Sequence, residues 1–229
     1  MPWRDGGREH AAGDAEKLGA QVDRMNNDTS RILFDYWNKL RGARRAPRRF
    51  EIEPARISRI LPEAFILEQQ DVDTYRFRIA GTRLCELFGV ELRDHNFLEL
   101  WEDEDRFPLK RRLAPVAEQG AVGLFEFEAY GSVREPVNFE VLIVPLIQKD
   151  AVIDRFLGTM SPSSEPLWLG MERLEHCHLL RHELIWPEPA PAKIVRPSLP
   201  EVRDARLVRI AHRSFRVYEG GLSRESGKR

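Results

Sequence analysis

The segment TYRFRIAGTRLCELFG, at residues 74–89, changes its hydrophobic period halfway along. Its first half alternates apolar residues with arginines, the pattern of a strand that buries one face. Its second half places apolar residues at helical spacing and ends at a glycine, which suits the left-handed end of a helix. The apolar positions are Tyr75, Phe77 and Ile79, and then Leu84, Leu87 and Phe88. The segment therefore predicts a strand that runs directly into a short helix, at a corner between a sheet and a helical layer.

The rest of the middle of the chain predicts an α+β domain. A helix is expected over residues 28–42, where Asp28, Thr29 or Ser30 can cap an apolar face and Gly42 can end it. Strands are expected at 64–70, 74–80, 123–130, 136–148 and 152–162, and a longer helix at 102–119. Little of the spacing between strands suits parallel crossovers, so we expect an antiparallel sheet with helices on one face.

Four segments of the chain differ in composition. Residues 1–27 are polar and rich in glycine and alanine, so we expect a flexible N-terminus. Residues 28–166 hold the α+β domain, and the apolar but irregular stretch 167–186 is expected to extend its core. Residues 187–229 begin with a proline-rich stretch, most of which cannot join a helix or a central strand, and end in charged residues. This last segment predicts a linker and a tail.

Composition argues against several classes of partner. The formal net charge is −1, which gives no basic field for nucleic acid or for an anionic membrane. No apolar run approaches the ~20 residues of a membrane span, and residues 1–30 are too polar for a secretory signal. Two cysteines, Cys85 and Cys177, do not make a disulfide framework. We therefore expect a cytoplasmic protein that binds neither nucleic acid nor membrane.

Three motifs of the chain resemble those of one family. They are YW..LRG.R..P.R from residue 36, ILP..FILE from residue 60 and YRFR.AGT.L...FG.EL from residue 75. Through them the chain is similar to the stand-alone PAS-domain proteins of alphaproteobacteria, over about residues 30–170. The resemblance implies a PAS fold, with a five-stranded antiparallel sheet and a small cavity between the sheet and its helices. It also implies a sensory or interaction module, so we expect no catalytic activity.

The PAS resemblance places a ligand cavity beneath the sheet. Apolar side chains of the strand at 74–80, of the helix that follows and of the later strands would line it. A small apolar ligand there would bias the packing of the helices if it bound one packing better than another. The expected cavity residues are Tyr75, Phe77, Ile79, Leu84, Phe88, Phe125, Phe127, Phe139 and Val141. They identify no cofactor.

The helix expected at 28–42 carries the expected interaction surface. Many PAS domains dimerise through a helix N-terminal to the core, and here its apolar residues are Leu33, Tyr36, Trp37 and Leu40. We therefore expect a homodimer that senses a small ligand or binds a regulatory protein. The alternative is a ligand-free dimerisation or adaptor module.

The candidate cofactor residues match known sites poorly. Flavin-binding PAS domains carry their reactive cysteine where this chain has RDHNFLELW, so Cys85 lies one helix too early and fits a buried apolar residue. His95 is not on the longer helix, where haem-binding PAS domains place their axial histidine. His176, His178 and His182 are the densest set of metal-type ligands, but no CxxC or HExxH accompanies them. We therefore expect no metal site.

The arginines of RGARRAPRRF, from residue 41, suit either an anion site or a solvated loop. Arg45 and Arg49 have the spacing of an RxxxR anion-binding pair, although the second half of that motif is missing downstream. A regulator that binds an anionic nucleotide or a metal is therefore the remote alternative. No nucleophile, base and orienting residue form a recognisable catalytic set.

Overall fold

A computed structural model describes residues 21–131, 135–148, 152–187, 206–210 and 213–217. The chain divides into two compact units, Met1–Pro191 and Ala192–Arg229. The helices of the first unit are α2 (Asp28–Arg41), α3 (Thr82–Phe88) and α4 (Asp103–Gln119), with the 3₁₀ helices η1 (Arg49–Glu51), η2 (Pro54–Glu63) and η3 (Phe97–Leu100). Its strands are β1 (Ala64–Gln69), β2 (Tyr75–Ala80), β3 (Val122–Tyr130), β4 (Val137–Ile147), β5 (Ile153–Pro162) and β6 (His176–Ile185).

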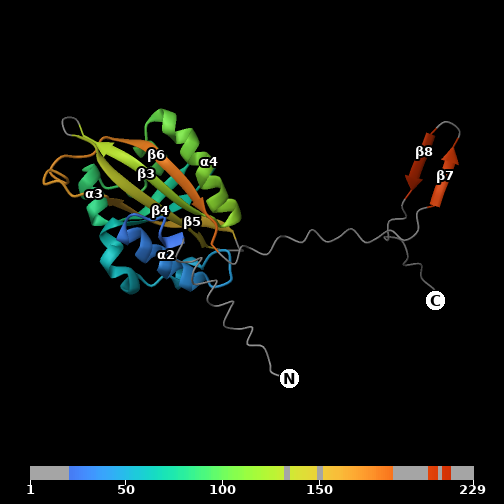
Figure 1. Cartoon of the computed structure of the whole chain (residues 1–229), viewed down its shortest axis with the longest axis horizontal. Helices are drawn as coiled ribbons and strands as arrows, with labels where there is room; N and C mark the ends of the chain where they lie inside the picture. The colour runs from blue at the N-terminus through green and yellow to red at the C-terminus, as the bar shows by residue number, and fades with distance from the viewer. Residues whose placement is uncertain (1–20, 132–134, 149–151, 188–205, 211–212, 218–229) are drawn as a thin grey trace, which may run out of the picture. The chain divides into compact units, whose positions relative to one another are not determined.

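These strands form one antiparallel sheet in the order β2-β1-β5-β4-β3-β6 (Figure 1). The expected α+β architecture is confirmed, with its five strands in place. β6 is a sixth strand at the edge, formed from the segment 167–186 that was expected only to extend the core. A shift in its register against β3 leaves Leu180 without a partner. Such a shift interrupts the alternation of a strand, which is why this segment shows no clean period.

The two faces of the sheet carry different helices. Phe127 and Phe139 are paired across β3 and β4 and face Trp101, on the side of α3, η3 and α4. On the other face α2 packs against β4 and β5, where Trp37 donates its indole N–H to the Pro145 carbonyl at 2.8 Å. Figure 1 shows α4 and α2 on opposite sides of the sheet. Helices were expected on one face of the sheet only, and α2 covers the other face as well.

Gly81 forms the corner that the sequence predicted between a strand and a helix. It lies between β2 and α3, and a Cβ atom at this position would stand 2.1 Å from the Pro62 carbonyl oxygen. Gly89 ends α3 in the left-handed conformation, with φ of 64°. The close backbone approach at Gly81 excludes every larger side chain, so glycine is what allows β2 to turn directly into α3.

The packed structure begins before α2. The cap of this helix is Asn27, whose side chain accepts a hydrogen bond from the Thr29 N–H at 3.0 Å, and not one of the three residues after it. Met25 is fully buried, and the backbone N–H groups of Asn26 and Asn27 donate to the Glu140 carboxylate at 2.7 and 3.1 Å. Residues 25–27 therefore belong to the packed domain and not to the flexible segment expected at 1–27. Residues 1–20 lie outside the described part of the chain.

Helix α4 continues past Pro115 to Gln119, and Gly120 follows it in the left-handed conformation with φ of 75°. Pro115 therefore lies within the helix and does not end it. Lys110 and Arg111 consequently lie in its middle and not in its last turn. The helix dipole, which acts within the first and last turns, does not account for their position.

The described part of the second unit is a hairpin. Its strands, β7 (Arg206–Ile210) and β8 (Arg213–Val217), pair antiparallel. Most of the expected linker and tail, at residues 188–205 and 218–229, lies outside the described residues.

Candidate functional site

The space predicted to hold a ligand is occupied by aromatic side chains. Phe127 stacks on Phe139 with ring centroids 5.2 Å apart, and Trp101 meets Phe127 edge-on at 4.9 Å. The contacts continue from Trp101 through Phe97 to Phe77, at 5.7 and 5.8 Å. Each of these rings is at most 2% exposed. Rings at such distances pack as a core, so the interior is filled at these positions.

Most of the predicted cavity residues are therefore core residues. They lie on the expected elements and are buried: Tyr75, Phe77, Leu84, Phe88, Phe125, Phe127, Phe139 and Val141. Sequence reasoning did not identify Phe97 and Trp101, which fill the space between them. The only signal in the sequence was NFLELW itself, which places two large aromatic residues close together before the longer helix.

Ile79 is the exception, and its assignment to the cavity is wrong. It is 50% exposed. Leu67 pairs with Phe77 and Ile66 pairs with Ile79 in the register of the two strands. Arg78 is therefore an extra residue in β2, a β-bulge, with no residue of β1 opposite it. A bulge of this kind moves the residues that follow it to the other face of the strand. Ile79 therefore lies beside Ile66 on the outer face of the sheet.

The predicted interaction helix turns its apolar residues toward its own domain. Leu33 and Trp37 are fully buried. Tyr36 is half-buried, and its hydroxyl accepts a hydrogen bond from the Glu53 N–H at 2.8 Å. Leu40 also packs against the core. These side chains hold α2 to the sheet, so Leu33 and Trp37 are not the surface patch that was expected.

An open groove lies along α4. Its volume of about 520 Å³ falls within the roughly 300–1,000 Å³ typical of ligand pockets. One wall is α4, another is made by the end of β1, the start of β2 and the turn between them, and the start of β5 closes it. Its polar residues are Arg45, Gln69, Tyr75, Lys110, Arg111 and Glu118. Its apolar residues are Val72, Ala114, Ala117, Val152 and Ile153.

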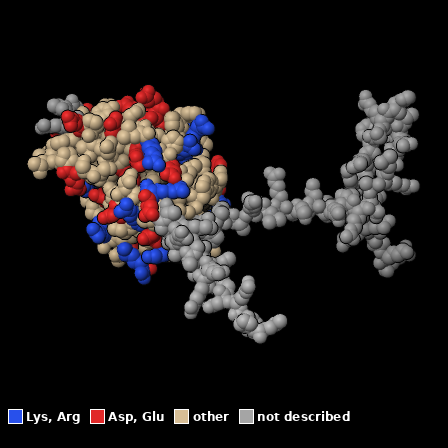
Figure 2. Space-filling view, viewed as in Figure 1, with Lys and Arg blue, Asp and Glu red and all other residues tan. Residues whose placement is uncertain are grey.

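Three basic side chains meet at this groove. Arg45 donates to the backbone carbonyl of Glu118, and Lys110 pairs with the carboxylate of Asp73. No described residue forms an ion pair with Arg45 or Arg111. Figure 2 shows acidic and basic side chains interspersed over the visible surface of the first unit. The groove is therefore a local excess of positive charge, which favours an anionic group.

Tyr75 belongs to both the core and the groove. Its ring packs 5.7 Å from that of Phe156, and its hydroxyl accepts a hydrogen bond from Gln69 Nε2 at 3.2 Å. Burial, and then the negative charges of Glu118 and Asp73, raise the pKa of Tyr75 to about 12. The hydroxyl therefore stays protonated at neutral pH and can donate a hydrogen bond into the groove.

Arg45 and Arg49 do not meet. Arg45 lines the groove along α4. Arg49 lies at an apolar depression of about 200 Å³ on the outer face, beside Leu61 and Ile79. The prediction that the two arginines bind one anion together is therefore wrong, and only Arg45 lies at the groove.

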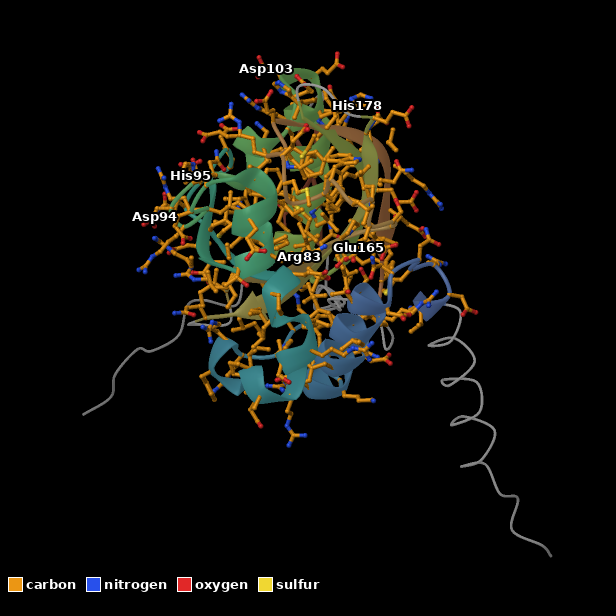
Figure 3. The ribbon with its side chains drawn as sticks, turned by 90° about the vertical axis from the view of Figure 1, so that its left-hand side faces the viewer. Arg83, Asp94, His95, Asp103, Glu165 and His178 are labelled. Atoms are coloured by element: carbon orange, nitrogen blue, oxygen red, sulfur yellow. The ribbon has the colours of Figure 1, made fainter. Side chains whose placement is uncertain are left out.

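The histidines of β6 meet carboxylates at the start of α4. His178 Nδ1 lies 2.9 Å from Asp105 Oδ2, and His176 Nδ1 lies 3.2 Å from Glu102 Oε1. Figure 3 shows His178 beside the first turns of α4. His182 lies apart from these pairs, and burial lowers its pKa. Among the described residues no three or more His, Cys, Asp or Glu side chains converge as metal ligands would.

The other candidate residues also lie away from the groove. The Cys85 thiol on α3 donates to Glu91 Oε1 at 3.6 Å, and burial raises its pKa. Cys177 is fully buried, which raises the pKa of its thiol strongly. His95 is exposed beside Asp94 in the loop before η3 (Figure 3). The groove along α4 is therefore the candidate site.

The sequence is similar to that of one described family of domains. A family model described as a PAS domain matches residues 25–161, more than half of the chain. No curated protein matches the sequence. Among solved structures, the crystal structure of the LOV protein of Rhodobacter sphaeroides matches at 12% identity and a TM-score of 0.37, over 48% of this chain and 68% of that one. The origin in alphaproteobacteria stays a prediction.

The family match covers the elements from α2 to β5 and so accounts for most of the first unit. The expected PAS fold and its sensory or regulatory character are confirmed at this level. In the described part of the chain, no helix has the length and hydrophobicity needed to cross a bilayer. Because the family model matches more than half of the chain, the chain belongs to the PAS domain family, as a sensory or regulatory domain.

Proposed function

We propose that the chain is a cytoplasmic, non-catalytic regulatory protein whose PAS domain binds a small ligand in the groove along α4. The observation that carries this proposal is the open volume of about 520 Å³ bounded by basic and apolar side chains. The interior beneath the sheet, where the ligand was first expected, is filled by Phe127, Phe139 and their neighbours. A ligand in the groove would need no displacement of these rings.

Such a ligand would act on α4. The groove uses residues of this helix from Lys110 to Glu118, and the first turn of the same helix is tied to β6. There the Asp105 carboxylate accepts a hydrogen bond from the Leu179 N–H at 2.8 Å and contacts His178. A ligand that prefers one position of α4 shifts the equilibrium by the difference of its affinities for the two positions. The open edge of β6 is where a partner protein would detect that shift.

Filling the groove tests the proposal. Ala114→Trp places a large side chain on the groove wall, and Ala55→Trp makes the same change at an exposed position of η2 outside it. The melting temperatures of these variants and of the full natural chain are compared with and without a panel of carboxylates, amino acids and nucleotides.

A ligand at 100 times its Kd stabilises a protein by about 2.7 kcal/mol, which raises the melting temperature of a domain of this size by roughly 5–10 °C. We expect at least one compound to do so with the natural chain and with Ala55→Trp, but not with Ala114→Trp. A shift that persists in Ala114→Trp, or no shift with any compound, contradicts the proposal.

A ligand-free interaction module is the second candidate, and the apolar depression on the outer face favours it. Leu61 and Ile79 are 38% and 50% exposed there, and β2 is an edge strand. Deletion of α2 would remove Leu33 and Trp37 from the core, so it is not a clean test. Light scattering on the full chain and on Ile79→Asp is sharper. A dimer that dissociates in Ile79→Asp supports this candidate, and a monomer in both removes the expected homodimer.

A further inference from the structure

We propose that the groove along α4 binds a monocarboxylate with an apolar body, such as a medium-chain fatty acid or an aromatic acid. This inference rests on the proposed ligand-sensing function and specifies the class of ligand. It follows from the net charge of the groove, from Arg111, which has neither an ion pair nor a hydrogen bond to a described residue, from the phenol of Tyr75 and from the apolar rim.

The charges around the groove leave one positive charge uncompensated. Arg45, Lys110 and Arg111 contribute three positive charges, and Asp73 and Glu118 contribute two negative ones. The nearby Asp71 also acts on Tyr75, and its charge is offset by that of Arg76. A single carboxylate balances this excess. A phosphate monoester carries roughly −1.5 to −2 at pH 7 and would exceed it.

Arg111 is the residue that we expect to hold the carboxylate. Lys110 is paired with Asp73, and Arg45 donates to the Glu118 carbonyl. Arg111 is exposed, and none of the described residues forms an ion pair with it. A guanidinium presents two parallel N–H donors that match the two oxygens of a carboxylate.

Tyr75 adds a neutral donor at the floor of the groove. Its hydroxyl oxygen accepts from Gln69 Nε2, and the described residues offer no acceptor for its own hydrogen. A phenol is protonated at physiological pH, so this hydroxyl is a hydrogen-bond donor there. A carboxylate oxygen is the acceptor that this hydrogen lacks.

The rim of the groove is apolar. Val72 and Val152 are 68% and 57% exposed, and Ile153, Ala114 and Ala117 continue the same lining. A single exposed valine is ordinary, but these two border one groove beside three cations. An apolar body attached to the carboxylate would cover them, which a small polar anion would not.

The position of the groove on α4 disfavours a nucleotide. Residues 110–118 lie in the second half of the helix, away from its positive N-terminal end. The free backbone N–H groups that bind phosphate at a helix N-terminus are therefore absent from this part of α4. Recognition of an anion here depends on side chains, chiefly on Arg111.

Titration calorimetry on the full chain tests the ligand class with four probes: octanoate, its uncharged amide octanamide, AMP and inorganic phosphate. We expect octanoate to bind and octanamide to bind at least about tenfold more weakly, because a charge-assisted hydrogen bond typically contributes a factor of ten or more. AMP and inorganic phosphate are expected to bind more weakly than octanoate.

Arg111→Gln and Arg112→Gln form a matched pair of variants. Both arginines are exposed on α4, but only Arg111 lines the groove. We expect Arg111→Gln to weaken octanoate binding at least about tenfold and Arg112→Gln to leave it within about twofold. Tyr75→Phe, which keeps the ring and removes the hydroxyl, should weaken octanoate binding about fivefold.

Three results would overturn the inference: equal binding of octanoate and octanamide, octanoate binding that Arg111→Gln leaves unchanged, or no binding of octanoate at all. AMP or phosphate binding that depends on Arg111, without octanoate binding, overturns the carboxylate class and leaves the ligand-sensing function standing. The Ala114→Trp comparison with the wider panel decides that function separately.

Discussion

The interior beneath the sheet and the groove along α4 share a wall at Tyr75, yet they differ in content. In the interior, rings such as Phe127 and Phe139 stand 4.9–5.8 Å from their neighbours and pack against one another at the positions where a ligand was expected. The groove keeps about 520 Å³ open beside Arg111. The difference shows that apolar residues facing the helices of a sheet are as well suited to filling a core as to lining a cavity.

The largest effect should come from removing a ring in the interior. Phe127→Ala deletes a fully buried ring that contacts Trp101 and Phe139, and we expect it to lower the free energy of unfolding by about 3–5 kcal/mol. Phe107→Ala on α4 is the control, since Phe107 is 61% exposed and its loss should cost about 0.5 kcal/mol or less. Urea unfolding measures both. A cost below about 1 kcal/mol for Phe127→Ala would contradict a tightly packed interior, because a loosely packed interior could hold a ligand.

The next effect concerns the joint between α4 and β6. Asp105→Ala removes the acceptor of the Leu179 N–H and the partner of His178, and we expect a loss of about 1.5–3 kcal/mol in the free energy of unfolding. Asp103→Ala, whose side chain is 91% exposed in the same helical turn, should cost about 0.5 kcal/mol or less. Equal urea midpoints for the two variants would show that β6 does not depend on α4.

The third effect is a pH dependence at the shared wall. Burial raises the pKa of Tyr75 in the folded chain to about 12, above the ordinary value of about 10 for a tyrosine phenol. A raised folded pKa means that the stabilisation is fully present below pH 10 and is lost as pH rises toward 12. The natural chain should therefore lose about 2 kcal/mol more than Tyr75→Phe between pH 9 and pH 11.5. Urea unfolding across this range measures the difference, and parallel curves would mean that the hydroxyl is not buried at the groove floor.

The smallest effect on stability is expected in the groove itself. Val152→Ala should change the free energy of unfolding by about 0.5 kcal/mol or less, because Val152 is 57% exposed. The same change should weaken octanoate binding about fourfold, by the loss of apolar contact with the ligand. Val90→Ala, at a 42% exposed valine outside the groove, controls for both measurements. If Val152→Ala clearly lowered the free energy of unfolding but left octanoate binding unchanged, Val152 would belong to the packed core and not to the ligand groove.

The order of the elements could be predicted from the sequence because it depends on local patterns. The change of period at residues 74–89 gave β2, Gly81 and α3 correctly. Ile79 was assigned to the wrong face because the bulge arises from pairing with β1, and the register of two strands is not visible in one of them. The sixth strand was missed for the same reason, since its shifted pairing with β3 interrupts the alternation.

The candidate site was less predictable than the fold. Arg45 was noted in a run of arginines, but its assumed partner Arg49 turned to the outer face. Lys110 and Arg111 line the same groove as Arg45 because the loop after α2 meets the end of α4, where Arg45 donates to the Glu118 carbonyl. Whether apolar residues line a cavity or fill it depends on the volume of all their neighbours, and Phe97 and Trp101 decide it here.

Methyl NMR of the full chain with added octanoate tests the central claim, that the ligand occupies the groove and not the interior. We expect the methyl signals of Val72, Ala114 and Val152 to shift with octanoate in a saturable way, because all three line the groove. The buried methyl groups of Leu84 and Val141 should keep their positions. Saturable shifts at Leu84 and Val141, with the groove signals unchanged, would contradict the account and place the ligand beneath the sheet.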